Sequence, residues 1–495
     1  MKRIFERIKN LKKKKTKIRI LEYILLSIIL IFAFLVRLYK INNPIADWHS
    51  WRQADTASVS RTFVEKGINL LYPRYHDVSS IQTGIFNPEG YRFVEFPVFN
   101  AVHAFLAKSF PELSLEVWGR LTSIFSALAS TVFIFLIGKK LMGKRVALLA
   151  ASFFAFIPYN IYFTRVILPE PMATTFALAS LWLFVEFLDR EKLGYLSLSG
   201  LVFGLSMLIK PFTFFYILPF IYLAHKKYGL ETIYKTPKLL IRLLVFVNLA
   251  FAPFIIWRAW INQFPQGIPF FTWAFNGDGI RFRPSFWRWI FGERLGHLIL
   301  GGWGLIVFAF GLLGKAKGTR FSQIFLLGMF LYVVIFATAS VRHDYYQIFV
   351  IPAVSFTMAL GTINIWNSLQ FNRWAARLLL IFSLVVMFFT STLQVKEFYK
   401  VNKPEIMEAG RAVDRLTPID AWVVAPYNGD TAFLYQTKRW GWPAIDDSID
   451  NIVEKGADYY VSVTLADPDT KMVRERFEVV EETPSYAIFD LNKKR

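Results

Sequence analysis

The sequence has no cysteine among its 495 residues, and it has only six histidines. The missing cysteine excludes a disulfide framework, a thiolate zinc site, an iron–sulfur cluster and a thiol nucleophile. The histidines form neither an HxxxH nor an HExxH pattern, which argues against a transition-metal site built from protein side chains alone.

Charged residues are also scarce, at 19%, whereas 55% of the residues are hydrophobic and 18% are aromatic. A soluble protein of this length carries more charge and fewer apolar residues. Apolar runs of about 18 or more residues recur along the chain, which is typical of membrane-spanning helices. The composition therefore predicts an integral membrane protein with many spans.

The formal net charge is +21, and residues 1–19 contribute ten Lys or Arg and one Glu to it. A basic tail could bind nucleic acid, but before an apolar run it is more simply an anchor to anionic lipid on the cytoplasmic side. The run after it has no small-residue cleavage site, so we expect a retained first span and not a signal peptide.

Basic loops between the apolar runs assign the sides of the membrane. They place the N-terminus inside and predict about eleven spans, so that the C-terminal end lies outside the cytoplasmic membrane. Long external segments are expected at 40–116 and 257–295. The predicted spans are 20–39, 117–137, 146–163, 171–188, 195–209, 212–224, 239–256, 297–313, 321–340, 347–364 and 375–394.

The last hundred residues, 396–495, differ from the rest and predict a small extracytoplasmic α/β domain, after a transmembrane domain over 20–395. Helical spacing alternates with strand-like runs, and a hairpin ends the chain. The expected helices are "PEIMEAGRAVDRL" and "SIDNIVEKGA", and the expected strands are "AWVVAP", "DYYVSVTL", "FEVVEE" and "SYAIFDL".

The stretch "DWHSWRQADTASVSRTF" follows the first predicted span and carries unusual polar chemistry. Ser50 and Gln53 fit a capping box, so we expect a helix from Trp51 to Lys66, lying flat at the membrane interface. Asp47 would then sit in a loop open to water-soluble groups, and Asp55 on the helix. Each acid also has a simpler, non-catalytic explanation. Asp47 could be a negative charge favoured by the dipole at the start of the helix, and Asp55 could form an ion pair with Arg52.

Further acids and cations recur at the external ends of the predicted spans. The acids could supply a general base, and the cations could grip an anionic group at the same level. Together they suit an amphiphile with a phosphate group and a long apolar tail. The candidates are Glu95, Arg165, Glu170, Lys210, Arg258, Arg342, His343, Tyr345 and Tyr346.

Over residues 20–365 these motifs resemble the GT-C glycosyltransferases that use polyprenyl-phosphate sugars. The branch is similar to protein O-mannosyltransferases and the lipid A aminoarabinose transferase. The resemblance rests on the order and side of "HSWRQADTA", "EFP", "TRVILPEP", "KP" and "HDYY". It implies an inverting transfer, in which an acid deprotonates the acceptor hydroxyl while lipid phosphate leaves the sugar.

The resemblance also suggests roles for individual residues. Arg52 and Gln53 stand where the family often has Asp-Glu, so Asp47 is preferred as the catalytic acid and Asp55 stays an alternative. Glu170 matches an acid of the second external loop, where Asp is commoner. The implied substrate-binding residues are Glu95, Arg165, Lys210, Arg258, Arg342, His343, Tyr345 and Tyr346.

The sequence leaves other choices open. Asp47, Asp55 and Glu170 could hold a hard divalent ion such as Mg²⁺ or Mn²⁺ through their oxygens. The acceptor could be a protein hydroxyl, a lipid or a surface glycan, and the sugar a hexose or a pentose. The rival functions are a transporter or flippase and a ligase of lipid-linked saccharides. We do not expect the protein to bind nucleic acid.

Overall fold

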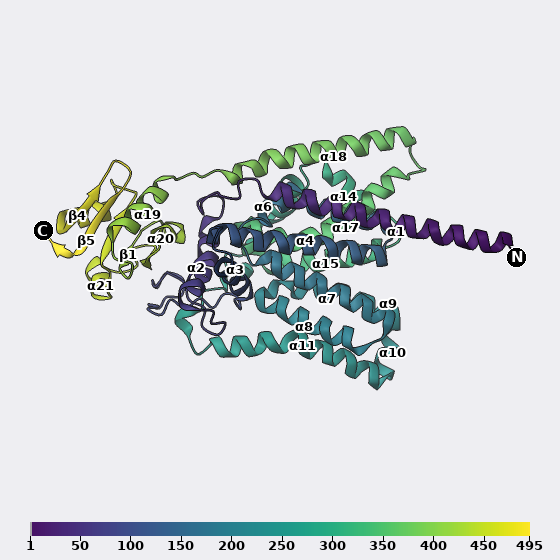
Figure 1. Ribbon diagram of the computed structural model, residues 1–495, viewed down its shortest axis with the longest axis horizontal. Helices are drawn as coiled ribbons and strands as arrows, with labels where there is room; N and C mark the ends of the chain where they lie inside the picture. The colour runs from purple at the N-terminus through teal and green to yellow at the C-terminus, as the bar shows by residue number, and fades with distance from the viewer. Residues whose placement is uncertain (1) are drawn as a thin grey trace.

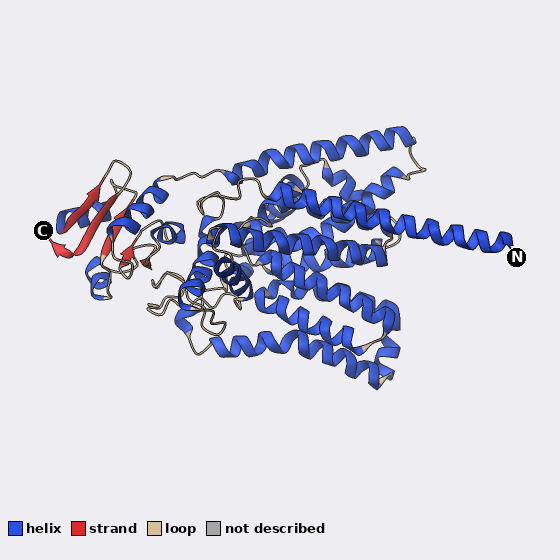
Figure 2. Ribbon diagram, viewed as in Figure 1, coloured by secondary structure: helices blue, strands red, loops and turns tan. Residues whose placement is uncertain are grey.

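The computed structural model describes residues 2–495, with side chains described from Ile20 onward, so the predicted lipid contact of the tail side chains 1–19 lies outside the described residues. Helices run side by side through most of the chain, and all five strands lie in its C-terminal part (Figures 1 and 2). The strands form a separate unit at one end of the bundle, and α1 (Lys2–Arg37) projects from the other end.

In the described part of the chain, six helices are long and apolar enough to cross a membrane, or seven if one bent pair counts as a span. The chain is thus a multi-pass membrane protein. The six are Ile20–Arg37 of α1, α4 (Leu115–Leu141), α7 (Glu170–Arg190), α11 (Pro237–Ile261), η5 with α17 (Asp344–Trp366), and α18 with η6 (Arg373–Tyr399).

The eleven expected spans are all helical, but the count of eleven is not confirmed, because five segments are short or broken. A new helix begins at Pro158, where the proline removes a backbone donor. The bent pair turns by 115°. The segments are α5 (Lys144–Phe156) with α6 (Pro158–Phe163), α8 (Leu193–Ile209), η1 (Pro211–Tyr216) with α9 (Ile217–Tyr228), α13 (Pro284–Trp287) and η4 (Arg288–Ile299) with α14 (Gly304–Leu313), and α15 (Thr319–Ile335).

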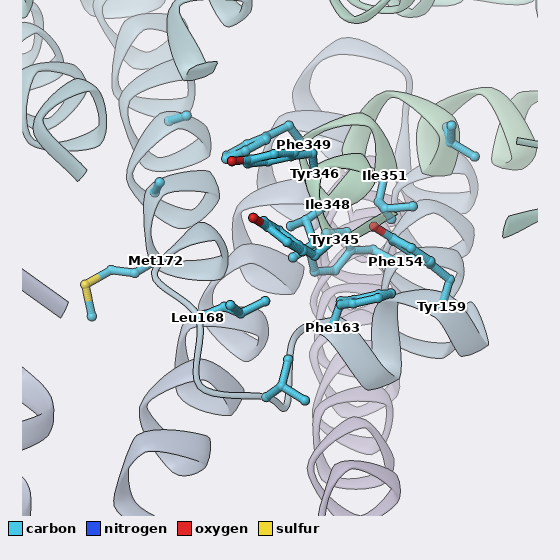
Figure 3. Packing of buried hydrophobic residues seen from close by; sticks show 14 of the residues in the cluster. Phe154, Tyr159, Phe163, Leu168, Met172, Tyr345, Tyr346, Ile348, Phe349 and Ile351 are labelled. Carbon is cyan, nitrogen blue, oxygen red and sulfur yellow. The ribbon is translucent and has the colours of Figure 1, made fainter. Parts of the chain in front are cut away.

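Some helices lie in the centre of the bundle and are buried, whereas others lie at its periphery and are exposed. The apolar window of α7 is 89% buried, whereas those of α11 and α18 are 17% and 28% buried, as suits helices that face lipid. Aromatic side chains of α6 and η5 (Asp344–Val350) fill the space beside α7 (Figure 3). Small residues permit close helix contact: a Cβ on Gly361 would lie 1.8 Å from the carbonyl oxygen of Val307.

Helix α2 (Ser50–Lys66) crosses the end of the bundle, next to α3 (Val98–Ser109) (Figure 1). The expected helix is present, but the expected capping box is wrong. His49 is the N-cap in a left-handed conformation without a side-chain cap, because the Gln53 amide donates to Asp47 instead. The side chains of α2 from Arg52 to Phe63 are mostly buried, so this helix does not present an open face.

A mixed five-stranded sheet follows, in the order β2-β1-β3-β5-β4. β1 is parallel to β2 and β3, and β5 is antiparallel to β3 and β4. The elements are α19 (Glu405–Leu416), β1 (Trp422–Val424), α20 (Thr431–Thr437), β2 (Trp440–Trp442), α21 (Ile449–Glu454), β3 (Tyr459–Ser462), α22 (Pro468–Arg476), β4 (Phe477–Glu482) and β5 (Ala487–Lys494). Of these, α20, β2 and α22 were not expected from the sequence.

The loop after α2 is attached to this sheet. Asp77 forms a parallel bridge with Gly441 of β2, and the Val78 N–H donates to the Gly441 carbonyl at 2.9 Å. The C-terminal unit is therefore fastened to the bundle through the segment that carries the candidate acids. The remaining short elements are α10 (Leu230–Lys235), η2 (Pro265–Gly267), α12 (Trp273–Asn276), η3 (Ile280–Phe282) and α16 (Ala337–Arg342).

Candidate functional site

Lys210 is the centre of a buried charged cluster at the end of the bundle. Its Nζ lies 2.6 Å from Glu95 Oε1 and 3.0 Å from Glu170 Oε1. Arg52 pairs with the same oxygen of Glu95. Two cations and two carboxylates thus come together from four distant parts of the chain, and we call these four residues the Lys210 cluster.

Local structure places each member of the cluster. Lys210 ends α8 in an extended conformation, because Pro211 cannot continue the helix. Glu170 occupies the first turn of α7, where the helix dipole favours a negative charge. Arg52 lies in the first turn of α2, and Glu95 lies in the loop before α3.

The two carboxylates of the cluster differ. Burial would raise the pKa of Glu95, but Arg52 and Lys210 outweigh it and hold that pKa below its usual range. Glu170 is fully buried, and neither of its oxygens accepts a well-formed hydrogen bond from any residue that the structure describes. Buried polar atoms are normally satisfied, so Glu170 has acceptor capacity left for a bound molecule.

Asp47 belongs to a second group, in the loop before α2. It accepts a hydrogen bond of 2.6 Å from Gln53 Nε2 and lies 3.5 Å from Arg165 Nη1. The side chains of Asp47 and Arg165 are both 0% exposed, so the expectation of a solvent-open Asp47 is wrong. Arg165 also donates to the Lys40 carbonyl, so the same guanidinium holds the loop between Lys40 and Asp47 in place.

Asp55 belongs to a third group, and the simpler reading of an ion pair between Asp55 and Arg52 is wrong. Asp55 lies 2.5 Å from Arg92 Nη2 and accepts a hydrogen bond of 2.7 Å from Thr431 Oγ1. It is buried between α2 and α20, so it joins the first loop to the C-terminal unit.

Aromatic side chains adjoin the Lys210 cluster. The Nζ of Lys210 is 5.8 Å from the ring centroid of Tyr346, whose centroid is 4.4 Å from that of Tyr345. His343 stacks on Tyr345 and lies 5.4 Å from the Trp51 ring. Burial lowers the pKa of His343 to about 3, so its ring is neutral near pH 7. The three expected binding residues of this segment therefore lie together.

Arg258 and Arg342 are expected site residues that the structure does not bring to this cluster. Arg258 is half-buried, with its guanidinium 5.3 Å from the Phe271 ring. Arg342 lies 3.6 Å from Asp278, on the surface. The prediction that both arginines lie near helix ends is correct, but these helix ends are not next to Lys210.

The three candidate acids do not fit a site for a hard divalent ion. Asp47 faces Arg165, Asp55 faces Arg92, and Glu170 faces Lys210. Throughout the described part of the chain, no three His, Asp or Glu side chains are grouped as metal ligands. We therefore derive no step through a metal.

Sequence reasoning missed several members of these groups. Arg52 was considered as a replacement for a family acid and as a partner of Asp55, but not as a site residue, and its charge was the available signal. Arg92 and Thr431 carry no local pattern, because they meet Asp55 only through tertiary contacts. Asp344, which accepts from Trp48 at 3.0 Å and lies 2.6 Å from His49, was likewise not assigned a role.

Comparisons with known proteins place part of the chain in a known family model. A family model for dolichyl-phosphate-mannose-protein mannosyltransferase matches residues 97–257. No curated protein matches the sequence significantly. The family model covers three expected site residues, Arg165, Glu170 and Lys210.

Solved structures share the fold over most of the chain. ArnT from Cupriavidus metallidurans, bound to undecaprenyl phosphate, is 12% identical with a TM-score of 0.62, covering 94% of this chain and 97% of that one. The oligosaccharyltransferase AglB from Archaeoglobus fulgidus, with an inhibitory peptide and a dolichol-phosphate, is 10% identical with a TM-score of 0.53, covering 92% and 72%. At these identities the likenesses show a shared fold, and together with the family-model match they support the predicted resemblance to the GT-C glycosyltransferases.

Proposed function

We propose that the protein is an inverting glycosyltransferase that moves a sugar from a polyprenyl-phosphate donor to an acceptor hydroxyl. The observation that carries this proposal is the Lys210 cluster, where two cations and a carboxylate with open acceptor positions are buried together beside tyrosines. The family model, and the lipid phosphates bound by ArnT and AglB, support the donor class.

Lys210 and Arg52 are the proposed phosphate ligands. Both are buried, and a charge-assisted hydrogen bond is stronger in such surroundings than in water. Glu95 and Glu170 hold the two cations in place before the donor binds. As the glycosidic bond breaks, the cations stabilise the negative charge that grows on the leaving phosphate.

Asp47 is the proposed general base. It lies in a non-helical loop, where Gln53 donates to it at 2.6 Å and Arg165 lies 3.5 Å away. Glu170 instead lies beside Lys210 in the proposed phosphate site, and Asp55 accepts from Thr431. The acceptor oxygen attacks the anomeric carbon, its proton passes to Asp47, and the bond from that carbon to the phosphate oxygen breaks. One such displacement inverts the anomeric configuration.

The expected orientation is part of the proposal. The N-terminal tail contacts anionic lipid on the cytoplasmic side, and the charged groups and residues 396–495 lie on the outer face of the plasma membrane. Arg258 and Arg342 are not assigned to the phosphate, because neither is among the ion pairs formed by the Lys210 cluster.

The test uses purified protein with a radiolabelled undecaprenyl-phosphate hexose and a cell-envelope extract as acceptor. We expect acceptor-bound label to appear with the wild type and to be absent without protein. If the protein binds the lipid yet leaves the glycosidic bond intact with every acceptor extract, the transferase proposal is wrong and a lipid transporter is the better account.

A further inference from the structure

A cavity of about 620 Å³ with both polar and apolar lining lies between the end of the bundle and the C-terminal unit. Its walls come from loop 42–45, from the start of α4, and from α19 with the end of α20. The volume is in the range of about 300–1,000 Å³ that is common for ligand sites. None of its lining residues belongs to the Lys210 cluster, so it is a separate compartment.

The acidic side chains of the cavity already have partners. Asp414 lies 2.6 Å from Lys438 Nζ. Glu116 accepts a hydrogen bond of 2.6 Å from the Tyr435 hydroxyl. The pair formed by Asp414 and Lys438 is neutral, whereas Glu116 remains a carboxylate because the Tyr435 hydroxyl carries no charge. The two arginines of the lining, Arg120 and Arg411, therefore face one remaining acid, which leaves an excess of one positive charge.

Arg120 is the arginine in the cavity wall that most clearly lacks a partner. It is 0% exposed, and its Nη1 donates to the carbonyls of Ile41 and Asn43 at 2.6 and 2.5 Å. Its Nε and Nη2 have no hydrogen-bond partner, and among the described residues no carboxylate lies within 4.0 Å of it or of Arg411. A buried guanidinium with unmade hydrogen bonds is costly, which favours an anionic ligand group here.

Most of the other polar lining is amide and hydroxyl. Asn42, Asn43, Ser114 and Gln436 contribute such groups, which pair with the hydroxyls of a saccharide. Peptide ligands usually need a free strand edge, a helix groove or aromatic pockets. No strand lines this cavity, and its aromatic residue Tyr435 is already bonded to Glu116.

The cavity adjoins the proposed base through one loop. Arg120 holds the carbonyls of Ile41 and Asn43, and Arg165 holds the carbonyl of Lys40 while facing Asp47. The loop that forms a wall of the cavity is therefore followed closely by Asp47 in the chain. A molecule in the cavity would lie next to the loop that positions Asp47.

We propose that this cavity binds the acceptor and that the acceptor is an acidic saccharide, with a carboxylate or phosphate group held by Arg120 and Arg411. The assignment of an acceptor role rests on the proposed transferase function. The binding of an acidic saccharide does not, so the two can fail separately.

The absence of cysteine from the chain permits a direct test, because one introduced thiol is the only one. Met407→Cys places it in the cavity wall, and Ile419→Cys places a control on a residue that is 86% exposed and outside the lining. Each variant is measured before and after reaction with biotin-maleimide. The probes are trigalacturonate, its methyl ester and a phosphorylated trimannose, with triglutamate as an acidic peptide and undecaprenyl phosphate as a donor-side probe.

We expect labelled Met407→Cys to bind the preferred acidic probe at least about tenfold more weakly than the unlabelled form, a loss of about 1.4 kcal/mol. Undecaprenyl phosphate should bind both forms equally, which shows that the fold is intact. Labelled Ile419→Cys should match wild type. The methyl ester should bind wild type weakly, and the stronger of trigalacturonate and the phosphorylated probe identifies the anionic group.

Three results would overturn the inference: equal binding by labelled and unlabelled Met407→Cys, no binding of either acidic saccharide by wild type, or tighter binding of triglutamate than of both. Transfer of labelled sugar to the bound probe is measured separately. Cavity binding that persists while no donor is ever cleaved would uphold the acidic-saccharide site and contradict the transferase.

Discussion

A lysine held between two carboxylates can bind a further anion only by exchanging partners. Without donor, Lys210 is neutralised by Glu95 and Glu170 at 2.6 and 3.0 Å, which keeps a buried ammonium group from being unpaired. A phosphate group would draw Lys210 away from one acid. The freed carboxylate would then need a hydrogen-bond donor, such as a hydroxyl group of the bound sugar.

Lys210→Gln should weaken the binding of undecaprenyl phosphate by about 10- to 150-fold, because a hydrogen bond to a charged group contributes about 1.5–3 kcal/mol. Isothermal titration in detergent measures this. The double variant Lys210→Gln/Glu170→Gln removes the unpaired charge and should recover thermal stability without recovering lipid binding. Recovery of both properties would show that Lys210 has a structural role alone.

Asp77 gives a pH prediction. Burial raises the pKa of Asp77 from its ordinary value to about 6, so the charged carboxylate destabilises the folded state. Its stabilising contribution is complete below about pH 4 and is lost as the pH rises through 6. Asp77→Asn keeps an oxygen for the Ser79 N–H, which donates at 2.8 Å.

We therefore expect the melting temperature of Asp77→Asn to exceed that of wild type at pH 7 and to equal it near pH 4. Melting curves from pH 4 to 8 measure the difference. A constant difference across that range would mean that Asp77 does not titrate in the folded protein.

At the scale of single residues, the sequence identified most of the groups but not their partners. Glu95, Glu170 and Lys210 were expected at one level, and the structure joins them. Asp47 was expected to be open to solvent, and the simpler reading of Asp55 was a local pair with Arg52, but both acids are buried against distant segments. Local spacing reveals pairs within a helix, whereas a partner that is 37 or 118 residues away, as in Asp55–Arg92 and Asp47–Arg165, has no such signal.

Helix positions followed from the apolar runs, since a run of sufficient length has one stable backbone form in lipid. The number of spans did not follow. Hydrophobicity does not show where a proline or a bend divides an apolar run into two helices. Such breaks occur at Pro158 and between η4 and α14. Strand β2 was missed because its sequence is WGW, and a central glycine is unfavourable in a strand, whereas the β-branched valines of the equally short β1 indicate one.

Close contact between α14 and α17 leads to a prediction about two glycines. A Cβ on Gly361 would lie 1.8 Å from the Val307 carbonyl oxygen, whereas one on Gly194 in α8 meets nothing within 4 Å. Gly361→Ala should destabilise the bundle by about 1–3 kcal/mol or more through overpacking. Gly194→Ala should be neutral or slightly stabilising, because alanine favours helix.

Thermal unfolding monitored by circular dichroism compares the two alanine variants. If they unfold at the same temperature, the two helices do not pack as closely as described.

At the scale of the whole molecule, the C-terminal unit and the bundle meet on the first loop. Asp55 bonds to Thr431, Asp77 bridges to Gly441, and Ser80 donates to Asp446 at 2.6 Å. These contacts bury α2, the helix that follows Asp47, so the C-terminal unit positions the proposed base from a distance.

Thr431→Val should loosen this attachment, because it leaves the buried Asp55 without one of its donors. We expect faster hydrogen exchange across residues 50–66 and slower sugar transfer, with undecaprenyl phosphate binding unchanged. Thr236→Val is the control, since Thr236 is exposed and its side chain caps no helix. Unchanged exchange in Thr431→Val would mean that α2 is held by the bundle alone.

The account as a whole depends on a transfer step that uses Asp47, and one measurement tests it most directly. Donor cleavage and lipid binding are followed for wild type, Asp47→Asn and Asp55→Asn with a radiolabelled undecaprenyl-phosphate hexose. We predict that Asp47→Asn loses at least about 100-fold in turnover, within the range for a general base, while binding the lipid as wild type does. Asp55→Asn should keep measurable turnover. Full turnover by Asp47→Asn, with loss only in Asp55→Asn, would contradict the assignment of the base.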